Sequence, residues 1–210
     1  MMEGCYFCEE GKDFTVAKRR LGHLWPYENE VVFHDENVFA IAGASPQVVP
    51  YVLILPYRHI YSVVEMTQAE KDGFQSCLKY LCGRGGYGKE LCIFEHGGKS
   101  EEGSSSIDHC HIHVIDGKYG LYYQKRYDDF QVYKNEIPEV KGSYLMVGRF
   151  NSDDLELKIA TSQIAHERQY FRRRLAEIIC DTRWDWHEDD RINKMIETMK
   201  GFVGLEQLLQ

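Results

Sequence analysis

The chain has 210 residues, 43% of them hydrophobic, which is enough for one large domain or a core domain with an extension. Its net charge of -8 argues against duplex nucleic acid or an anionic membrane as the main partner, although local donors can still hold a small phosphorylated ligand. No apolar run reaches membrane-span length, no signal peptide pattern opens the chain, and seven scattered cysteines do not resemble a disulfide framework, so we expect a cytoplasmic protein with no membrane partner.

Two cysteines near the N-terminus have the spacing of half a zinc site. Cys5 and Cys8 form a C-x2-C pair. No second C-x2-C follows, and two ordinary cysteines fit this spacing about as well as metal ligands do. A bound metal would need its remaining ligands, histidines or acids, from elsewhere in the fold.

The next residues predict part of a sheet. Residues 30–34 and 38–42 have the pattern of two strands joined by a tight polar turn. The apolar run 51–55 predicts a central strand that ends at Pro56. His59 follows at that strand end, where a ligand or a catalytic group is favoured, although a lone histidine there is more often a surface residue.

A helix, a strand and a loop come next. Thr67 and Glu70 fit a capping box, and apolar residues recur at helical spacing as far as residue 81. Residues 91–95 predict a further strand. The loop 99–106 is rich in glycine and serine and offers hydroxyl and backbone N–H groups that suit an anion, although its composition also fits a plain flexible turn.

Three histidines alternate with non-ionisable residues just after this loop. The pattern over 109–115 predicts a strand with His109, His111 and His113 on one face and Cys110 turned to the core. On a regular strand the first and third histidines lie about 13 Å apart, so all three cannot reach one metal ion. We therefore expect the three histidines to have different roles.

The remainder of the chain predicts a strand and two helices. The strand covers 144–147, the first helix covers 163–180, and the second has an apolar stripe from residue 192. Three adjacent arginines in the first helix, residues 172–174, point in different directions. A solvated face is their default interpretation, and a contact between one of them and a substrate phosphate is the less common alternative.

The residues support two kinds of chemistry. Cys5, Cys8, His59 and one strand histidine would complete a Cys2His2 zinc site, which leaves the other histidines free for catalysis. A neutral imidazole can attack phosphorus and form a phosphoramidate. The rival is a metal-dependent oxygenase that uses His-x-His with Glu95 or Asp116, but it leaves the cysteine pair unexplained.

The motif of residues 109–115 resembles the signature of the histidine triad superfamily. Its other landmarks occur in the expected order: the C-x2-C pair, the Pro-x-x-His of residues 56–59, and the Phe-Glu-His-Gly of residues 94–97. The likeness covers roughly residues 5 to 115. The segments 169–173 and 184–186 resemble the C-terminal extension of a bacterial branch.

The resemblance implies a nucleotide phosphoester or phosphoanhydride hydrolase that acts through a nucleotidyl-histidine intermediate. His111 would attack the α-phosphorus, and His113 would contact the phosphate together with Ser106 or Ser105. By similarity to one branch, His109 and His59 would join the two cysteines on a structural zinc. The base would bind in an apolar cleft around Phe33, Phe39 and Ile41.

Some positions depart from the family pattern. In the loop before the triad, Ser105 replaces the usual glutamine, and Gly103 lies one position early. After the triad, Asp116-Gly117 replaces the usual arginine. A nucleotidyltransferase to a sugar phosphate or phosphate therefore stays an alternative. A nucleotide-binding protein without turnover is another.

These observations predict an α+β fold with an antiparallel sheet and helices on one face. Residues 1–117 would form the histidine-triad-like catalytic domain, and residues 118–210 a strand and helix extension packed on it. The expected partner is a nucleotide or nucleoside phosphate. Dimerisation is common in the superfamily, so a homodimer is compatible with the resemblance, but no stretch indicates it.

Overall fold

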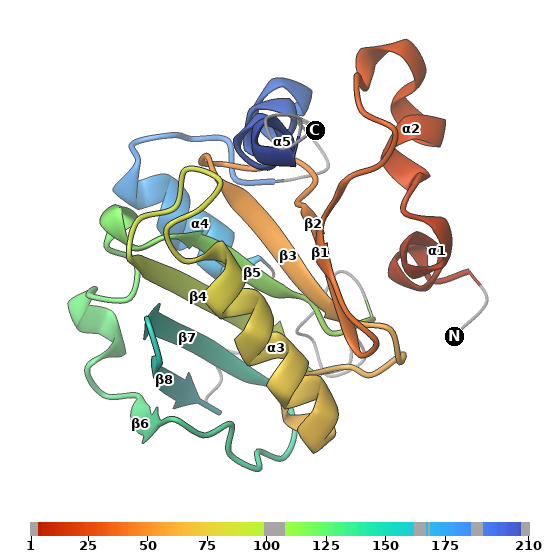
Figure 1. Ribbon diagram of the computed structural model, residues 1–210. Helices are drawn as coiled ribbons and strands as arrows, with labels where there is room; N and C mark the ends of the chain where they lie inside the picture. Colours follow the sequence, from red (N-terminus) through yellow and green to blue (C-terminus); the bar gives the residue numbers. More distant parts are fainter. Residues whose placement is uncertain (1–3, 99–107, 162–166, 168, 186–190, 207–210) are drawn as a thin grey trace.

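One antiparallel sheet organises the molecule. The computed structural model describes residues 4–98, 108–161, 167, 169–185 and 191–206. These residues form an eight-stranded sheet with the order β1-β2-β3-β5-β4-β7-β8-β6 (Figure 1). The strands are β1 (Val31–His34), β2 (Val38–Ala42), β3 (Tyr51–Pro56), β4 (Glu90–Gly97), β5 (Ile112–Asp116), β6 (Gln131–Lys134), β7 (Tyr144–Asn151) and β8 (Asp154–Ala160).

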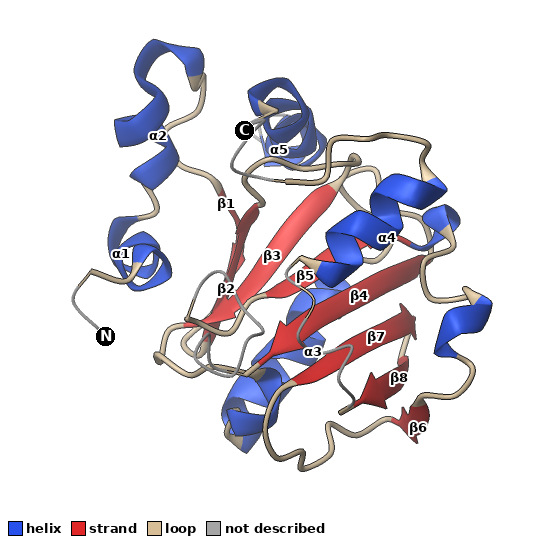
Figure 2. Ribbon diagram, turned by 180° about the vertical axis from the view of Figure 1, so that it is seen from behind, coloured by secondary structure: helices blue, strands red, loops and turns tan. Residues whose placement is uncertain are grey.

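Helices cover both faces of the sheet. They are α1 (Tyr6–Asp13), α2 (Val16–Leu21), α3 (Gln68–Leu81), α4 (Tyr170–Ile178) and α5 (Ile192–Glu206), with short 3-10 turns at Gly22–Leu24, Val63–Glu65, Gly117–Tyr119 and Lys125–Tyr127. Figure 1 shows α3 in front of the sheet, and Figure 2, seen from behind, shows α4 across the opposite face. The predicted α+β class is confirmed, but the expectation of helices on a single face is not. Phe7 of α1 and Phe171 of α4 are both buried in the cluster on the opposite face, so α1 covers that face together with α4 of the C-terminal extension.

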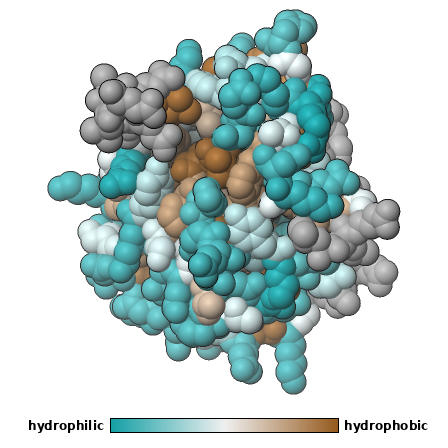
Figure 3. All heavy atoms as spheres, turned by 45° about the vertical axis from the view of Figure 1, so that its right-hand side comes forward, coloured by the Kyte–Doolittle hydropathy of each residue, from teal (hydrophilic) through white to brown (hydrophobic). Residues whose placement is uncertain are grey.

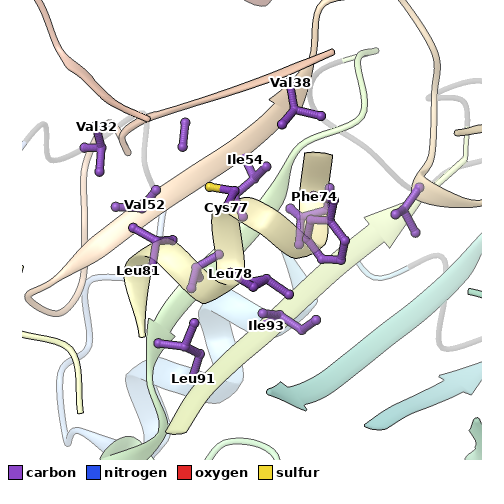
Figure 4. Close-up of a cluster of buried hydrophobic side chains, with 14 of the residues drawn as sticks. Val32, Val38, Val52, Ile54, Phe74, Cys77, Leu78, Leu81, Leu91 and Ile93 are labelled. Atoms are coloured by element: carbon purple, nitrogen blue, oxygen red, sulfur yellow. The ribbon is translucent and has the colours of Figure 1, made fainter. Parts of the chain in front are cut away.

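The face under α3 holds the larger hydrophobic cluster. The capping box at Thr67 and Glu70 is present as predicted, and it starts α3 with its apolar stripe toward the sheet. Figure 4 shows this stripe against β2, β3 and β4. The buried residues from α3 are Phe74, Cys77, Leu78 and Leu81, and they meet Val38, Val52, Ile54, Leu91 and Ile93.

The opposite face carries the second cluster. It is built from β2 to β5 and β7, and it is covered by α1, α4 and the turns after β5. Phe171 of α4 packs against Phe94 of β4, with 5.3 Å between the ring centroids. Because His113 pairs with Phe94 and Leu53 in neighbouring strands, its side chain lies on this face, beneath the N-terminal and C-terminal helices.

The C-terminal part of the chain continues the same sheet. β7 pairs with β4 along its whole length, from Glu90 opposite Asn151 to Gly97 opposite Tyr144. The strand predicted at 144–147 is therefore the first half of a longer one, and β6 and β8 extend the sheet beyond it. The helix predicted over 163–180 is observed as α4, while residues 162–166 and 168 lie outside the described part.

The surface is mostly hydrophilic on the face seen in Figure 3, and hydrophobic side chains gather in a recess near its centre. Among the described residues, the large exposed hydrophobic side chains are Leu24, Tyr123 and Val132. None of the helices in the described ranges combines the length and the hydropathy needed to cross a membrane.

Candidate active site and metal centre

The histidine segment is only partly a strand. β5 begins at Ile112, so His109 and His111 precede the ladder, in contrast to the strand predicted from residue 109. The N–H of Cys110 instead donates to the backbone carbonyl of Ile60, in the segment after β3, at 2.6 Å. This contact bends the chain and turns His109 into the interior, where it is 1% exposed, while His111 and His113 are half-buried.

The structure brings Cys5, Cys8, His59 and His109 together, with all four ligand atoms within 4.8 Å of one another. Cys5 Sγ lies 3.4 Å from His109 Nδ1, and Cys8 Sγ lies 3.4 Å from His59 Nδ1 and 3.6 Å from His109 Nδ1. Bonds of about 2.3 Å to sulfur and about 2.0 Å to nitrogen in a tetrahedral zinc site separate neighbouring ligand atoms by about 3.5 Å. The donor set and its spacing therefore fit zinc.

Local structure orients these ligands. Cys5 is the N-cap of α1 and Cys8 lies one turn later, so both thiols face the same side of the helix start. His109 Nε2 lies 3.0 Å from the carbonyl oxygen of Pro56, which must accept, so the proton is on Nε2 and the Nδ1 lone pair faces the cysteines. Burial lowers the pKa of His109 to about 4, so the ring is neutral, as a metal ligand must be.

His111 has a defined tautomer. Its Nδ1 lies 2.7 Å from the carbonyl oxygen of His109. Because a carbonyl can only accept, Nδ1 carries the proton and Nε2 keeps the lone pair. The ring rests against Phe7 of α1, with 5.2 Å between centroids, and burial lowers the pKa of His111.

His113 is held by a tyrosine and an aromatic ring. Its Nδ1 lies 2.7 Å from Tyr51 Oη, and its ring stacks on Phe94 at 4.7 Å with 7° between the planes. The His111 and His113 rings are 5.0 Å apart. Burial, with smaller contributions from His111 and Arg172, holds the pKa of His113 well below its usual value. Both histidines are therefore neutral around neutral pH.

A cavity of about 250 Å³ opens beside these two rings. Its walls come from α1, β2 to β5 and α4, with one residue each of α2 and α5. Most of the lining is apolar, and the polar groups include the two histidines, Tyr51, Glu30 and Arg172. An apolar pocket with a few convergent polar groups is typical of a small-molecule site.

The predicted base-contact residues separate in the structure. Ile41 lines the cavity. Phe39 is fully buried beneath it, against Tyr57 at 4.9 Å, and Phe33 packs on Tyr80 of α3 on the other face of the sheet. The structure therefore brings only Ile41 of the three to the cavity.

A β-bulge explains the position of Phe33. β1 pairs Val31 with Ile41, and a regular antiparallel ladder would then pair Phe33 with Phe39 on the cavity side. The register shifts between Val31 and Phe33, so Phe33 lies opposite Ala40 instead. A one-residue shift moves a side chain to the other face.

The remaining expected residues are either outside the described part of the chain or turned away from the cavity. Ser105 and Ser106 are not among the described residues. Glu95 points to the α3 side, where it accepts hydrogen bonds from Val63 N and from the Cys110 and Tyr144 side chains. Asp116 accepts from the backbone N–H groups of Gly88 and Lys118, so neither carboxylate of the oxygenase alternative joins the histidines.

Sequence reasoning did not single out Tyr51 or Arg172, two polar residues of the cavity that contact each other. Tyr51 stands in an apolar strand, and a buried tyrosine hydroxyl needs a partner, which is the signal that could have found it. Arg172 is one of three adjacent arginines and is 6% exposed, while Arg173 stacks on Trp184 and Arg174 pairs with Glu177. Only the packing of α4 distinguishes Arg172 from its neighbours.

Residues 27–120 match the family model of the HIT domain. Similar solved structures include a HIT family hydrolase from Clostridium thermocellum, at 23% identity over 56% of this chain and 93% of that chain, TM-score 0.35. A zinc-bound histidine triad family protein from Mycobacterium smegmatis is 18% identical over 54% of this chain and 74% of that chain, TM-score 0.34. A yeast Ap4A phosphorylase in complex with AMP is 14% identical over 70% of this chain and 65% of that chain, TM-score 0.41.

Proposed function

From the premise that this chain belongs to the histidine triad superfamily, we propose that it is a nucleotide hydrolase with His111 as the nucleophile. The observation that carries the proposal is the 2.7 Å contact between His111 Nδ1 and the carbonyl oxygen of His109. It leaves the Nε2 lone pair of a cavity-lining ring available for attack on phosphorus.

The reaction proceeds in two displacements. His111 Nε2 attacks the α-phosphorus, the N–P bond forms, and the bond from phosphorus to the leaving oxygen breaks. Water then attacks the same phosphorus, the N–P bond breaks, and a nucleoside monophosphate leaves with His111 restored. In the transferase alternative, a phosphate or sugar-phosphate oxygen replaces water in the second step.

His113 is placed to act on the phosphate oxygens. Arg172 Nη1 lies 3.5 Å from Tyr51 Oη, so this oxygen accepts from the guanidinium, and we assign its own proton to the bond with His113 Nδ1. His113 then carries its proton on Nε2, which can donate to a phosphate oxygen. The base would rest on the apolar wall that includes Ile41 and Leu53.

Cys5, Cys8, His59 and His109 would hold a structural zinc. Four protein ligands would close the coordination sphere, so the metal would stabilise the fold and would not activate water. Its role would be to fasten α1 to the segment before β5, and this attachment keeps Phe7 against the His111 ring.

Adduct trapping tests the nucleophile. A panel of nucleotides labelled at the α-phosphate, including ATP and Ap4A, is mixed with the protein and quenched in base, since the N–P bond is acid-labile. The wild type should carry label, the His111→Gly variant should not, and the exposed His23→Gly variant serves as the matched control. Label that survives His111→Gly would exclude this mechanism, and absence of label and turnover in the wild type would favour the binding protein without turnover.

Metal analysis tests the zinc site independently. We expect about one zinc per chain, lost in Cys8→Ser together with thermal stability, because zinc binding contributes to folding. Cys82→Ser is a matched control, since Cys82 lies at the end of α3, away from the cluster. A folded, zinc-free wild type that zinc does not stabilise would contradict the assignment.

A further inference from the structure

Arg172 is a buried cation whose hydrogen-bond acceptors among the described residues are all uncharged. It lies in α4, which crosses the sheet face that carries the histidines (Figure 2), and only 6% of its surface is exposed. Its Nε donates to Trp184 O at 2.9 Å, its Nη2 to Ser45 O at 2.8 Å, and its Nη1 approaches Tyr51 Oη at 3.5 Å. All three acceptors are neutral. Within the described residues, no carboxylate lies in ion-pair contact with it.

The hydrogen bonds leave part of the guanidinium unused. A guanidinium has five N–H groups, and the three contacts use one on each nitrogen. One N–H therefore remains on each of Nη1 and Nη2, and both can donate to the oxygens of an anion. Arg172 lines the cavity itself, so these two donors border the space that a ligand would occupy.

Among the described residues that line the cavity, Arg172 is the only buried lysine or arginine. Arg20 is the other arginine on the described wall of the cavity, and it is exposed to solvent. The ring of His113, which also lines the cavity, has a pKa held well below its usual value by burial. A buried charge is costly unless an opposite charge accompanies it, and a phosphate bound at the two histidines would supply one.

We propose that Arg172 binds the phosphate charge of the substrate, which makes helix α4 part of the active site. This inference rests on the proposed nucleotide function but concerns a different residue and a different step, binding instead of bond formation. Tyr51 links the guanidinium to His113, whose ring is 5.0 Å from His111, so an anion at these histidines lies beside Arg172. The segment that distinguishes this chain from a bare HIT domain then contributes to substrate binding.

Calorimetric binding of AMP and adenosine tests the proposal, because the two ligands differ only by the phosphate. The wild type should prefer AMP. Arg172→Met should weaken AMP binding about 10- to 100-fold, the range for a hydrogen-bonded charge, and change adenosine binding less than about 3-fold. Arg174→Met removes a cation of the same helix that pairs with Glu177, and it should leave both affinities unchanged.

The variant's fold needs a separate check, because Arg172 also holds the Ser45 and Trp184 carbonyls. Circular dichroism and thermal unfolding report whether Arg172→Met is folded. Arg172→Lys keeps the charge and loses the paired donors, so it should bind AMP with intermediate affinity. The wild type alone is also decisive: equal affinity for AMP and adenosine overturns the proposal, as does an equal loss of both in Arg172→Met.

The AMP-binding test can succeed or fail independently of the test of His111 as the nucleophile. A lost AMP preference in Arg172→Met supports the anion role even if no His111 adduct can be trapped. If the wild type binds neither AMP nor adenosine, inorganic phosphate becomes the probe. Thermal stabilisation by phosphate that is absent in Arg172→Met supports the anion site without nucleotides, and absence of stabilisation in the wild type overturns it.

Discussion

Glu95 should make the stability of this protein depend on pH. Its carboxyl group is 2% exposed, and burial raises its pKa to about 7, although hydrogen bonds from Tyr144, Cys110 and Val63 N act in the opposite direction. A carboxyl with a raised pKa keeps its proton longer in the folded than in the unfolded chain. The folded state therefore gains stability at low pH and loses it as pH rises from the unfolded value, 4.5, to about 7.

The size of the effect follows from the two pKa values. Linkage gives a loss in the free energy of unfolding of about 0.8 kcal/mol at pH 5 and about 3.3 kcal/mol at pH 8, relative to the protonated state. Between pH 5 and pH 8, the ionisation of Glu95 thus lowers the free energy of unfolding by about 2.5 kcal/mol. This is a large fraction of the stability of a typical domain.

Glu95→Gln isolates this contribution. Its amide oxygen can still accept from Val63 N and Cys110, and its NH2 group can donate to the Tyr144 hydroxyl, so no buried polar group loses its partner. Urea unfolding of both proteins from pH 5 to pH 8 gives the two free-energy profiles. The wild type should lose about 2.5 kcal/mol more than the variant over this interval. Parallel profiles would refute the reasoning and indicate a Glu95 that ionises normally.

Three further substitutions test the core, the helix cap and the cavity. Phe74→Ala empties a fully buried site under α3 and should cost about 3–5 kcal/mol in urea unfolding; a loss below about 1 kcal/mol would contradict the packing in Figure 4. Thr67→Ala removes the capping box and should lower the unfolding free energy by about 0.5–2 kcal/mol, whereas the exposed Ser76→Ala should change it little. Tyr51→Phe removes the partner of His113 Nδ1 and should lower kcat more than it raises KM for any nucleotide that is turned over; unchanged kcat would exclude a role for this hydroxyl in the reaction.

The C-x2-C pair, the Pro-x-x-His and the alternating histidines were readable from the sequence because each depends on local spacing. The same is true of α3, whose capping box and apolar stripe lie within 15 residues of Thr67. These features were sufficient to predict the superfamily, the antiparallel sheet and the group of four metal-ligand candidates. Each of these features can be recognised from residues close together in the sequence, before the fold brings them into contact.

Other features depend on contacts between distant segments. The bulge in β1 moves Phe33 to the α3 side of the sheet. Residues 30–34 alone do not predict it, because the register shift exists only in the pairing with β2. Arg172 is chemically identical to its two neighbours, and only the packing of α4 over the sheet buries its guanidinium beside Tyr51. The sequence by itself determined which side chains can carry the chemistry. The tertiary structure decided which of them meet, because register and helix packing are set by contacts across the whole chain.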